Sequence, residues 1–207
     1  MLSIAFLNWA RAIASFRRVG EVLDEKIDLT DENAKHKDRA VCEGSVEFQN
    51  VSFRYYKNSL EWVIENISFK LEAGKTLGII GPTGSGKSTL VSMIPRLYDT
   101  DEGTVLVDGI NVRDYGLKPL REGIGMVLQN NTLFSGSITE NLKWGDEHAD
   151  EKAVRKAAQN AQAAGFIDSF KDGYRTRLEQ SGNNVSGGQK QRLCIARALL
   201  SVRKSLF

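Results

Sequence analysis

The sequence has 207 residues, which is the length of one domain or of one domain with appendages. Hydrophobic residues make up 41% and charged residues 26%, as in an ordinary globular protein with a core of normal size. The formal net charge of +2 is too small to indicate nucleic acid or an anionic membrane surface as a partner.

The first predicted element is a helix over Met1–Asp24, where apolar residues recur at roughly helical spacing and no proline intervenes. The apolar run Met1–Ala10 is shorter than the ~20 residues that cross a bilayer. Its arginines follow the run, whereas a secretory signal has its positive charge first. By itself the pattern predicts an amphipathic surface helix on a soluble protein.

A solvated linker is predicted over residues 25–44, which are rich in charge and poor in large apolar side chains. His36, and His148 further on, have no neighbours that would complete a metal site. Cys42 and Cys194 lie far apart and in no metal-ligand spacing, which favours a reducing, cytosolic setting.

Strands are predicted from Ser45 onward, where apolar and polar residues alternate from Val46 to Tyr55 with a slip near Asn50. A turn is expected at Asp108-Gly109. The other predicted strands cover residues 63–69, 75–81, 103–107 and 124–129. A strand, a glycine-rich loop, a helix and a later strand are typical of an α/β fold.

Residues 132–200 are predicted to be mostly helical. Ser137 and Glu140 have the spacing of a capping box, and good helix formers fill 151–164 and 189–200.

A glycine-rich loop follows the predicted strand 75–81 and opens a helix, in the pattern G-x-x-x-x-G-K-[ST]. Its glycines allow backbone N–H groups to approach phosphate oxygens. The Lys87 ammonium is expected to contact the β- and γ-phosphates, and the Ser88 hydroxyl is expected to bind Mg²⁺. The predicted nucleotide-binding residues here are Gly81, Pro82, Thr83, Gly84, Ser85, Gly86, Lys87, Ser88 and Thr89.

A second motif, Val185-Ser186-Gly187-Gly188-Gln189, is a turn of small residues that leads into a helix and can present donors to an anion. It closely resembles the signature sequence of ABC ATPases, which is normally led by leucine. The two motifs, in this order and about a hundred residues apart, identify the chain as similar to this family over nearly its whole length.

The resemblance implies roles for two further residues. Tyr55 matches the aromatic residue that stacks on adenine, although Tyr56 is adjacent and a plain surface tyrosine is a rival interpretation. Gln129, at the end of a predicted strand, matches the glutamine that senses Mg²⁺ and the attacking water and couples to the membrane part.

Exporters are the branch of the family that the chain looks most like, through the segments 132–142 and 179–182. The Met1–Asp24 helix is similar to the cytoplasmic end of the last transmembrane helix of an exporter. The resemblance implies a P-loop α/β core with an antiparallel β-subdomain and a helical subdomain at about 132–200. It also implies that two such domains enclose two ATP molecules, each between Lys87 of one subunit and Ser186 of the other.

In that branch the ATP-binding domain, here 45–207, works with a second such domain and a transmembrane domain, at the cytoplasmic face of the cell membrane, to export a substrate. The substrate cannot be inferred from these residues. Homodimers and heterodimers both remain open. A soluble ABC ATPase of DNA repair or translation is an alternative.

The sequence departs from the family after Leu200, where the Walker B aspartate, the catalytic carboxylate and the switch histidine do not follow. We therefore expect a fold that is incomplete at the C-terminus, unstable and unable to hydrolyse ATP by itself. A non-enzymatic nucleotide-binding remnant of an interrupted gene is the corresponding alternative.

Overall fold

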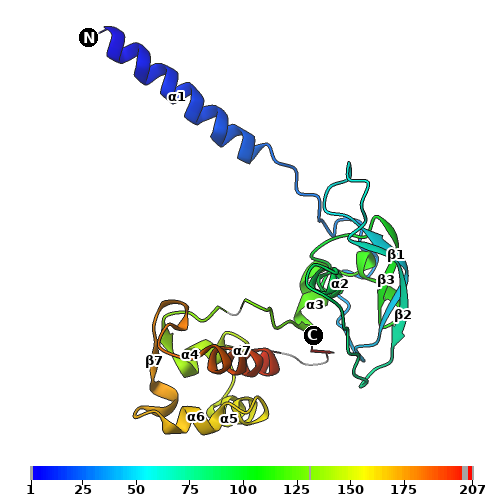
Figure 1. Ribbon diagram of the computed structural model, residues 1–207, viewed down its shortest axis with the longest axis vertical. Coiled ribbons are helices and arrows are strands. Elements are labelled where there is room, and N and C mark those ends of the chain that lie inside the picture. Colours follow the sequence, from blue (N-terminus) through cyan, green and yellow to red (C-terminus); the bar gives the residue numbers. More distant parts are fainter. Residues whose placement is uncertain (1, 131, 202–204, 207) are drawn as a thin grey trace. The chain divides into compact units, whose positions relative to one another are not determined.

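The computed structural model describes residues 2–130, 132–201 and 205–206, in two compact units that divide between Thr30 and Asp31. The first unit consists mainly of α1 (Leu2–Leu23), so the predicted N-terminal helix is confirmed (Figure 1). Its described side chains, from Asn8 to Leu23, are exposed except at Gly20. Among the described residues, no helix combines the length and the apolar character needed to cross a membrane.

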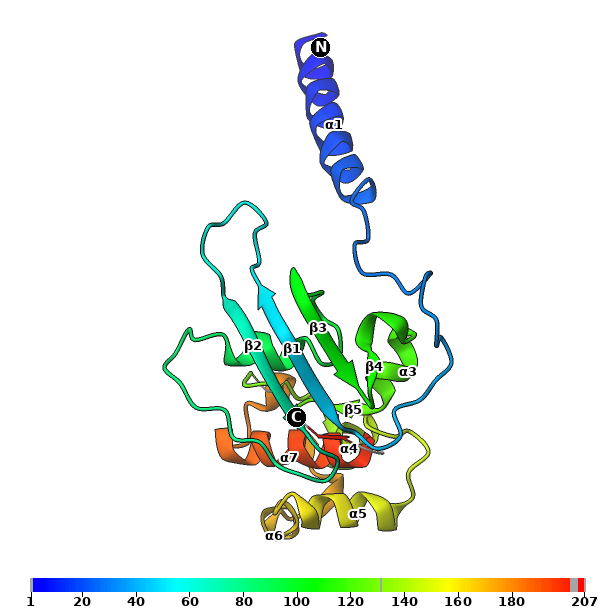
Figure 2. The ribbon, with the colours of Figure 1, turned by 90° about the vertical axis from the view of Figure 1, so that its right-hand side faces the viewer.

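The second unit contains a four-stranded antiparallel sheet in the order β2-β1-β3-β4 (Figure 2). The strands are β1 (Val46–Phe53), β2 (Ile64–Leu71), β3 (Glu102–Val107) and β4 (Ile110–Asn111). The alternating pattern of the sequence places Val46 and Phe48 of β1 in the core and leaves Gln49 exposed.

The predicted slip in β1 is confirmed at Asn50, whose φ is 50°. The pairing of β1 with β2 shifts between Phe48 and Val51, as a β-bulge requires. Gly103 of β3, with φ 74°, faces this bulge, and a Cβ atom there would lie 2.3 Å from the Asn50 carbonyl oxygen. Glycine is therefore needed where β3 meets the bulge.

The segment predicted as a solvated linker, 25–44, is divided at Asp31. Residues from Asp31 onward belong to the second unit and form contacts with the rest of it. The Asp31 carboxylate accepts a hydrogen bond from the Leu117 N–H at 2.9 Å. Val41 is buried against Gly123, where an added Cβ would lie 2.6 Å from the Val41 side chain. The prediction of a solvated linker over 25–44 is therefore wrong for residues 31–44, which are part of the second unit.

The Asp108 carboxylate holds the end of the same segment at the turn between β3 and β4. It accepts hydrogen bonds from four consecutive backbone N–H groups, at 2.7, 3.1, 2.7 and 3.0 Å. The donors are Cys42, Glu43, Gly44 and Ser45. We define the residues from Asp31 to Ser45 as the docked linker.

The strand predicted at 75–81 is wrong for this structure, which has irregular chain there. Ile80 is 98% exposed. Of the strand predicted at 124–129, only β5 (Ile124–Gly125) forms, paired in parallel with β8 (Ser205–Leu206). A strand persists only where a neighbour takes its backbone hydrogen bonds, and no described strand pairs with 75–81.

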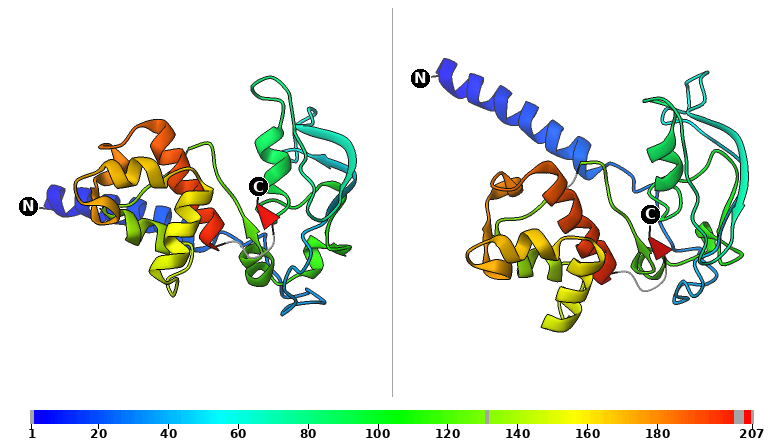
Figure 3. Two further views of the ribbon diagram at one scale, coloured as in Figure 1. Left: turned by 90° about the horizontal axis from the view of Figure 1, so that it is seen from below. Right: turned by 60° about the horizontal axis from the view of Figure 1, so that its bottom comes forward.

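The helices of the second unit form two groups. The prediction that residues 132–200 are mostly helical is confirmed by the larger group. Helices α2 (Lys87–Ser92) and α3 (Leu117–Glu122) belong to the part that contains the sheet. Figure 3 shows the other group, which consists of α4 (Ile138–Lys143), α5 (Glu151–Asn160), α6 (Ala164–Ser169) and α7 (Gly187–Ser201), with the short strands β6 (Gly136–Ser137) and β7 (Arg177–Leu178). The predicted capping box is confirmed at α4, where Ser137 and Glu140 bond reciprocally.

Each group has its own hydrophobic core. The first is centred on the inner face of the sheet and includes Phe48, Met93 and Tyr115. The second lies among the helices and includes Ile138 and Leu193. Leu90, just after the glycine loop, belongs to the first core, and Val185 of the signature motif belongs to the second.

Candidate functional site

The glycine loop ends at α2 with Lys87 folded back onto it. The Lys87 ammonium donates to the carbonyl oxygens of Gly81 at 2.9 Å and Pro82 at 2.7 Å, and to the Ser85 hydroxyl at 3.3 Å. Three oxygen acceptors match the three donors of an ammonium group. Lys87 therefore sits at the centre of the loop, where phosphate oxygens would offer acceptors of the same kind.

The backbone of the loop adopts conformations that need glycine. Gly84 and Gly86 have φ of 85° and 79°. A Cβ at Gly86 would lie 2.7 Å from the Val63 carbonyl oxygen, so the loop also packs closely on the chain before β2. Within the described residues, no hydrogen bond uses the N–H groups of Gly84, Gly86, Lys87 or Ser88. These N–H groups can donate hydrogen bonds to a bound anion.

A cavity of about 1010 Å³ lies beside the loop, and Lys87, Ser88 and Gln129 contribute to its wall. The rest of the wall is mainly apolar and includes Phe48 and Leu77. Among its described lining residues there is no carboxylate. The two predicted Mg²⁺-binding side chains thus both line this cavity, and they offer a hydroxyl and an amide oxygen, the hard oxygen donors that Mg²⁺ prefers.

Tyr55 lies just after β1 and differs clearly from Tyr56. Its hydroxyl is 2.8 Å from the Thr89 hydroxyl in the first turn of α2, and its ring is 49% exposed. Tyr56 is 79% exposed and has no side-chain hydrogen bond or aromatic contact among the described residues. Of the two, only Tyr55 is connected to the glycine loop.

The signature motif begins α7 with a reciprocal pair of hydrogen bonds. The Ser186 N–H donates to the Gln189 side chain at 2.9 Å, and the Gln189 N–H donates to the Ser186 hydroxyl at 3.3 Å. Ser186, Gly187 and Gly188 are exposed and do not line the cavity beside Lys87. The sequence predicted a helix start here, but not that Gln189 caps it.

Two aromatic side chains stack on the surface of the helical group. The rings of Phe134 and Trp144 are 4.3 Å apart and nearly parallel, and they are 40% and 66% exposed. The Arg197 guanidinium lies 5.8 Å from the Phe134 ring. Exposed stacked aromatic side chains beside arginine are typical of a protein contact surface.

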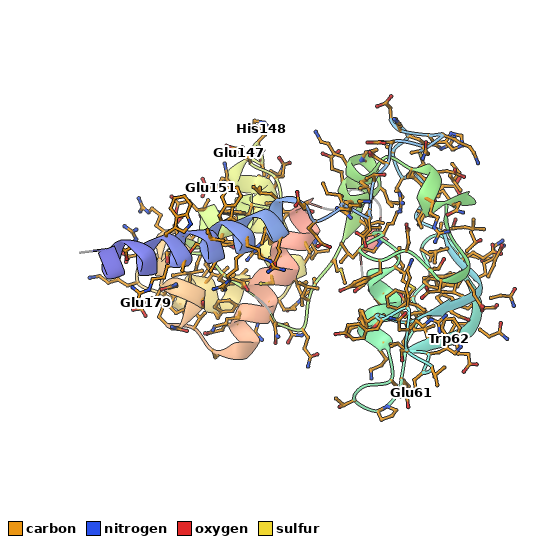
Figure 4. All side chains as sticks on the ribbon, turned by 90° about the horizontal axis from the view of Figure 1, so that it is seen from above. Glu61, Trp62, Glu147, His148, Glu151 and Glu179 are labelled. Atoms are coloured by element: carbon orange, nitrogen blue, oxygen red, sulfur yellow. The ribbon has the colours of Figure 1, made fainter. Side chains whose placement is uncertain are left out.

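Other residues that the sequence drew attention to stand apart from the loop. Glu179 lies with the helical group (Figure 4). His148 lies shortly before α5 in the same view. In the part of the chain that the structure describes, no three His, Cys, Asp or Glu side chains are placed to hold a metal ion.

Sequence reasoning missed the Tyr55–Thr89 hydrogen bond and the aromatic contacts of Tyr98 with Phe53 and Tyr55. Thr89 was expected only among the loop residues, and Tyr98 had no motif around it. All three contacts join residues more than thirty positions apart in the sequence, so no local pattern indicates them.

The family model described as ABC transporter matches residues 64–207. The chain is 47% identical over 191 residues to the ATP-binding/permease protein YgaD of Bacillus subtilis (strain 168), whose name proposes multidrug export. It is 39% identical to the ATP-dependent lipid A-core flippase of Desulfotalea psychrophila. Each alignment covers 92% of this chain, but only 32% of the first relative and 33% of the second, so the chain spans about a third of their length.

A solved structure of a bacterial Atm1-family ABC exporter with ATP bound has a TM-score of 0.84 with this chain. The sequences are 33% identical, and the match covers 100% of this chain and 36% of the exporter.

Proposed function

The chain belongs to the ABC transporter family, and from this membership we propose that it is the ATP-binding motor domain of an exporter, which couples ATP binding and hydrolysis to export across a membrane. The names of the relatives support the exporter assignment over a soluble ATPase of DNA repair or translation. The observation that carries the proposal is the glycine loop, where Lys87 lies beside backbone N–H groups that have no hydrogen bond among the described residues.

In this proposal the phosphates of ATP bind at the loop. Lys87 exchanges its three loop oxygens for phosphate oxygens, and the N–H groups of Gly84 and Gly86 donate to the same anion. The base stacks on Tyr55. Ser88 and Gln129 would hold Mg²⁺, which neutralises charge on the phosphates when it is bound.

Helix α7 contributes to a second nucleotide in a partner copy. Ser186, Gly187 and Gly188 are exposed, they follow Val185 of the helical core, and they do not line the cavity to which Lys87 contributes. An exposed helix start with small residues can approach an anion that another subunit holds. We therefore place ATP between Lys87 of one ATP-binding domain and Ser186 of the other.

The transmembrane domain is the second proposed partner, which would hold this chain at the cytoplasmic face of the membrane. Helix α1 (Leu2–Leu23) is the proposed connection, since large apolar side chains such as Phe16 are exposed along it. The stacked pair Phe134 and Trp144 is a surface that such a domain would cover.

The test is nucleotide binding by the 207-residue chain and by its Lys87→Ala variant, measured by calorimetry with Mg²⁺ and ATP. We expect binding by the first and a loss of at least tenfold in affinity in the second, because a charge-assisted contact to phosphate is removed. Phosphate release should not exceed the Lys87→Ala level, since no carboxylate lines the cavity of the described residues. Equal ATP affinity in both proteins would contradict the proposal.

A further inference from the structure

We infer that Thr89 and Tyr98 are positioning residues, which hold the Tyr55 ring in place and couple binding of the nucleotide base to the phosphate loop. The inference rests on the proposed function, because it assumes that the base stacks on Tyr55. It assigns to Thr89 a role through its side chain that is separate from any contact with phosphate.

The first support is the bond between the two hydroxyl groups. The Tyr55 and Thr89 oxygens are 2.8 Å apart, which is the ordinary length of an O–H···O hydrogen bond. Thr89 is only 7% exposed, so its hydroxyl has little access to water as an alternative partner. It follows Lys87 and Ser88 by two residues and one residue, in the same short helix α2. The bond therefore connects the aromatic ring directly to the helix that carries the phosphate-binding residues.

The second support is an aromatic frame around Tyr55. Its ring lies edge to face with Phe53, at 5.1 Å and 83°, and with Tyr98, at 5.2 Å and 84°. Phe53 and Tyr98 also contact each other, with centroids 5.5 Å apart. The two perpendicular contacts of the Tyr55 ring, at these distances, are a favourable arrangement of aromatic rings. The frame and the hydroxyl bond together restrict rotation of the Tyr55 side chain.

The loop that carries Tyr98 is itself fixed by a network of charges. Asp99 pairs with Arg96 at 2.8 Å and with Arg113 at 3.4 Å. Arg113 also donates to the Thr100 carbonyl oxygen at 2.6 Å. The Arg96 side chain is only 7% exposed, so this network is more than a surface ion pair. The backbone that carries Tyr98 is therefore held in place, so that the Tyr98 ring contacts Tyr55 in a fixed position.

A preorganised ring loses little conformational freedom when a base stacks on it. Without the hydroxyl bond, part of the stacking free energy would be spent on ordering Tyr55. The base-dependent part of affinity should therefore depend on Thr89, whereas the phosphate-dependent part should not depend on the Tyr55 hydroxyl.

The experiment measures affinity of the 207-residue chain for ATP and for inorganic triphosphate, which lacks the base, and takes the ratio of the two. Tyr55→Phe keeps the ring and removes the hydroxyl, and Thr89→Val replaces the hydroxyl with a methyl group. Each should lower the ratio about two- to tenfold, the range of one neutral hydrogen bond, and the double variant should lower it no further. Tyr98→Leu should lower it as well, because it removes one wall of the frame.

Thr89→Ser, which restores the hydroxyl, and Tyr56→Phe, which removes a hydroxyl with no partner among the described residues, should both keep the wild-type ratio. A wild-type ratio in Tyr55→Phe, or additive losses in the double variant, would overturn the inference while the Lys87→Ala result still supports the proposed function. If the unaltered chain binds neither ATP nor triphosphate, the proposed function and the inference both fail.

Discussion

Asp108 shows how one side chain can fix a long stretch of the chain. It lies at the turn between β3 and β4 with φ 49°, and its two oxygens accept the four N–H groups of residues 42–45. Burial acts to raise the pKa of the Asp108 carboxyl, but the four backbone hydrogen bonds outweigh it and hold the pKa below the ordinary value of 3.8. The folded state therefore favours the ionised carboxylate.

We predict that Asp108→Asn lowers the free energy of unfolding by roughly 2 kcal/mol at neutral pH, because an amide offers one acceptor oxygen in place of two charged ones. Asparagine tolerates the positive φ, so backbone strain does not add to the effect. Since the folded-state pKa of Asp108 is depressed, its contribution is fully present above about pH 4 and is lost as the pH falls through the folded-state pKa.

Urea unfolding at pH 7 and at pH 3 measures this difference. Glu122→Gln is the control, because the Glu122 carboxylate is exposed and its one ion pair, with the Lys118 ammonium, is long at 3.9 Å among the described residues. A difference between Asp108→Asn and the unaltered chain that does not shrink in acid would contradict the prediction.

The two neighbouring tyrosines allow a direct comparison at the same scale. Tyr55→Ala should weaken ATP binding by about 1–3 kcal/mol, the value of a lost base stack. Tyr56→Ala should matter less, since that ring is 79% exposed and is not connected to the loop by a contact of the described residues. Titration with a fluorescent nucleotide measures both variants, and equal losses would assign the base to neither ring in particular.

Among the elements, α7 begins with its own capping box, formed by Ser186 and Gln189. We predict that Gln189→Ala destabilises the chain by about 0.5–1 kcal/mol, because the Ser186 N–H loses its acceptor. Gln189→Glu should keep wild-type stability, since a carboxylate accepts the same bond. Gln159→Ala, at an exposed position in α5, is the matched control.

Thermal unfolding followed by circular dichroism measures this effect, with amide exchange at Ser186 as the local readout. If Gln189→Ala and Gln159→Ala shift the midpoint equally, the side-chain bond at Ser186 does not stabilise α7.

The elements that sequence patterns predicted well are those determined by local chemistry. The alternation of β1, its bulge at Asn50 and the capping box at Ser137 each depend on residues within a few positions. The failure at 75–81 has the opposite cause, because an apolar run becomes a strand only when another strand supplies its hydrogen bonds. Of the site, the glycine loop and the signature helix could be predicted, since a motif marks each. The docked linker could not, because a charged sequence gives no sign that Asp108 will bind it.

At the scale of the whole molecule, much apolar surface is accessible. Leu77 and Ile79 line the cavity of about 1010 Å³ and are 45% and 39% exposed, and Ile80 next to them is 98% exposed. Such a surface favours association between molecules. We predict that the folded chain binds the hydrophobic dye ANS.

ANS fluorescence of the native chain measures this accessibility. Leu77→Lys should lower it clearly, because it places a charge on the cavity wall. Leu60→Lys is the matched control, since Leu60 is 96% exposed but lies in the loop between β1 and β2 and does not line the cavity. An equal decrease in both variants would show that the dye binds exposed side chains in general.

The docked linker has a consequence for exchanging this domain between transporters. A cut placed before Ser45, where the strand pattern begins, would remove the Asp31 contact with Leu117, the Val41 side chain that fills the space at Gly123, and three of the four donors to Asp108. A cut before Asp31 would keep all of them. A chimaera joined at Asp31 should therefore keep all of the contacts that hold the docked linker. In a chimaera joined at Ser45, the preceding residues of the other transporter would have to supply the contacts with Asp108 and Gly123.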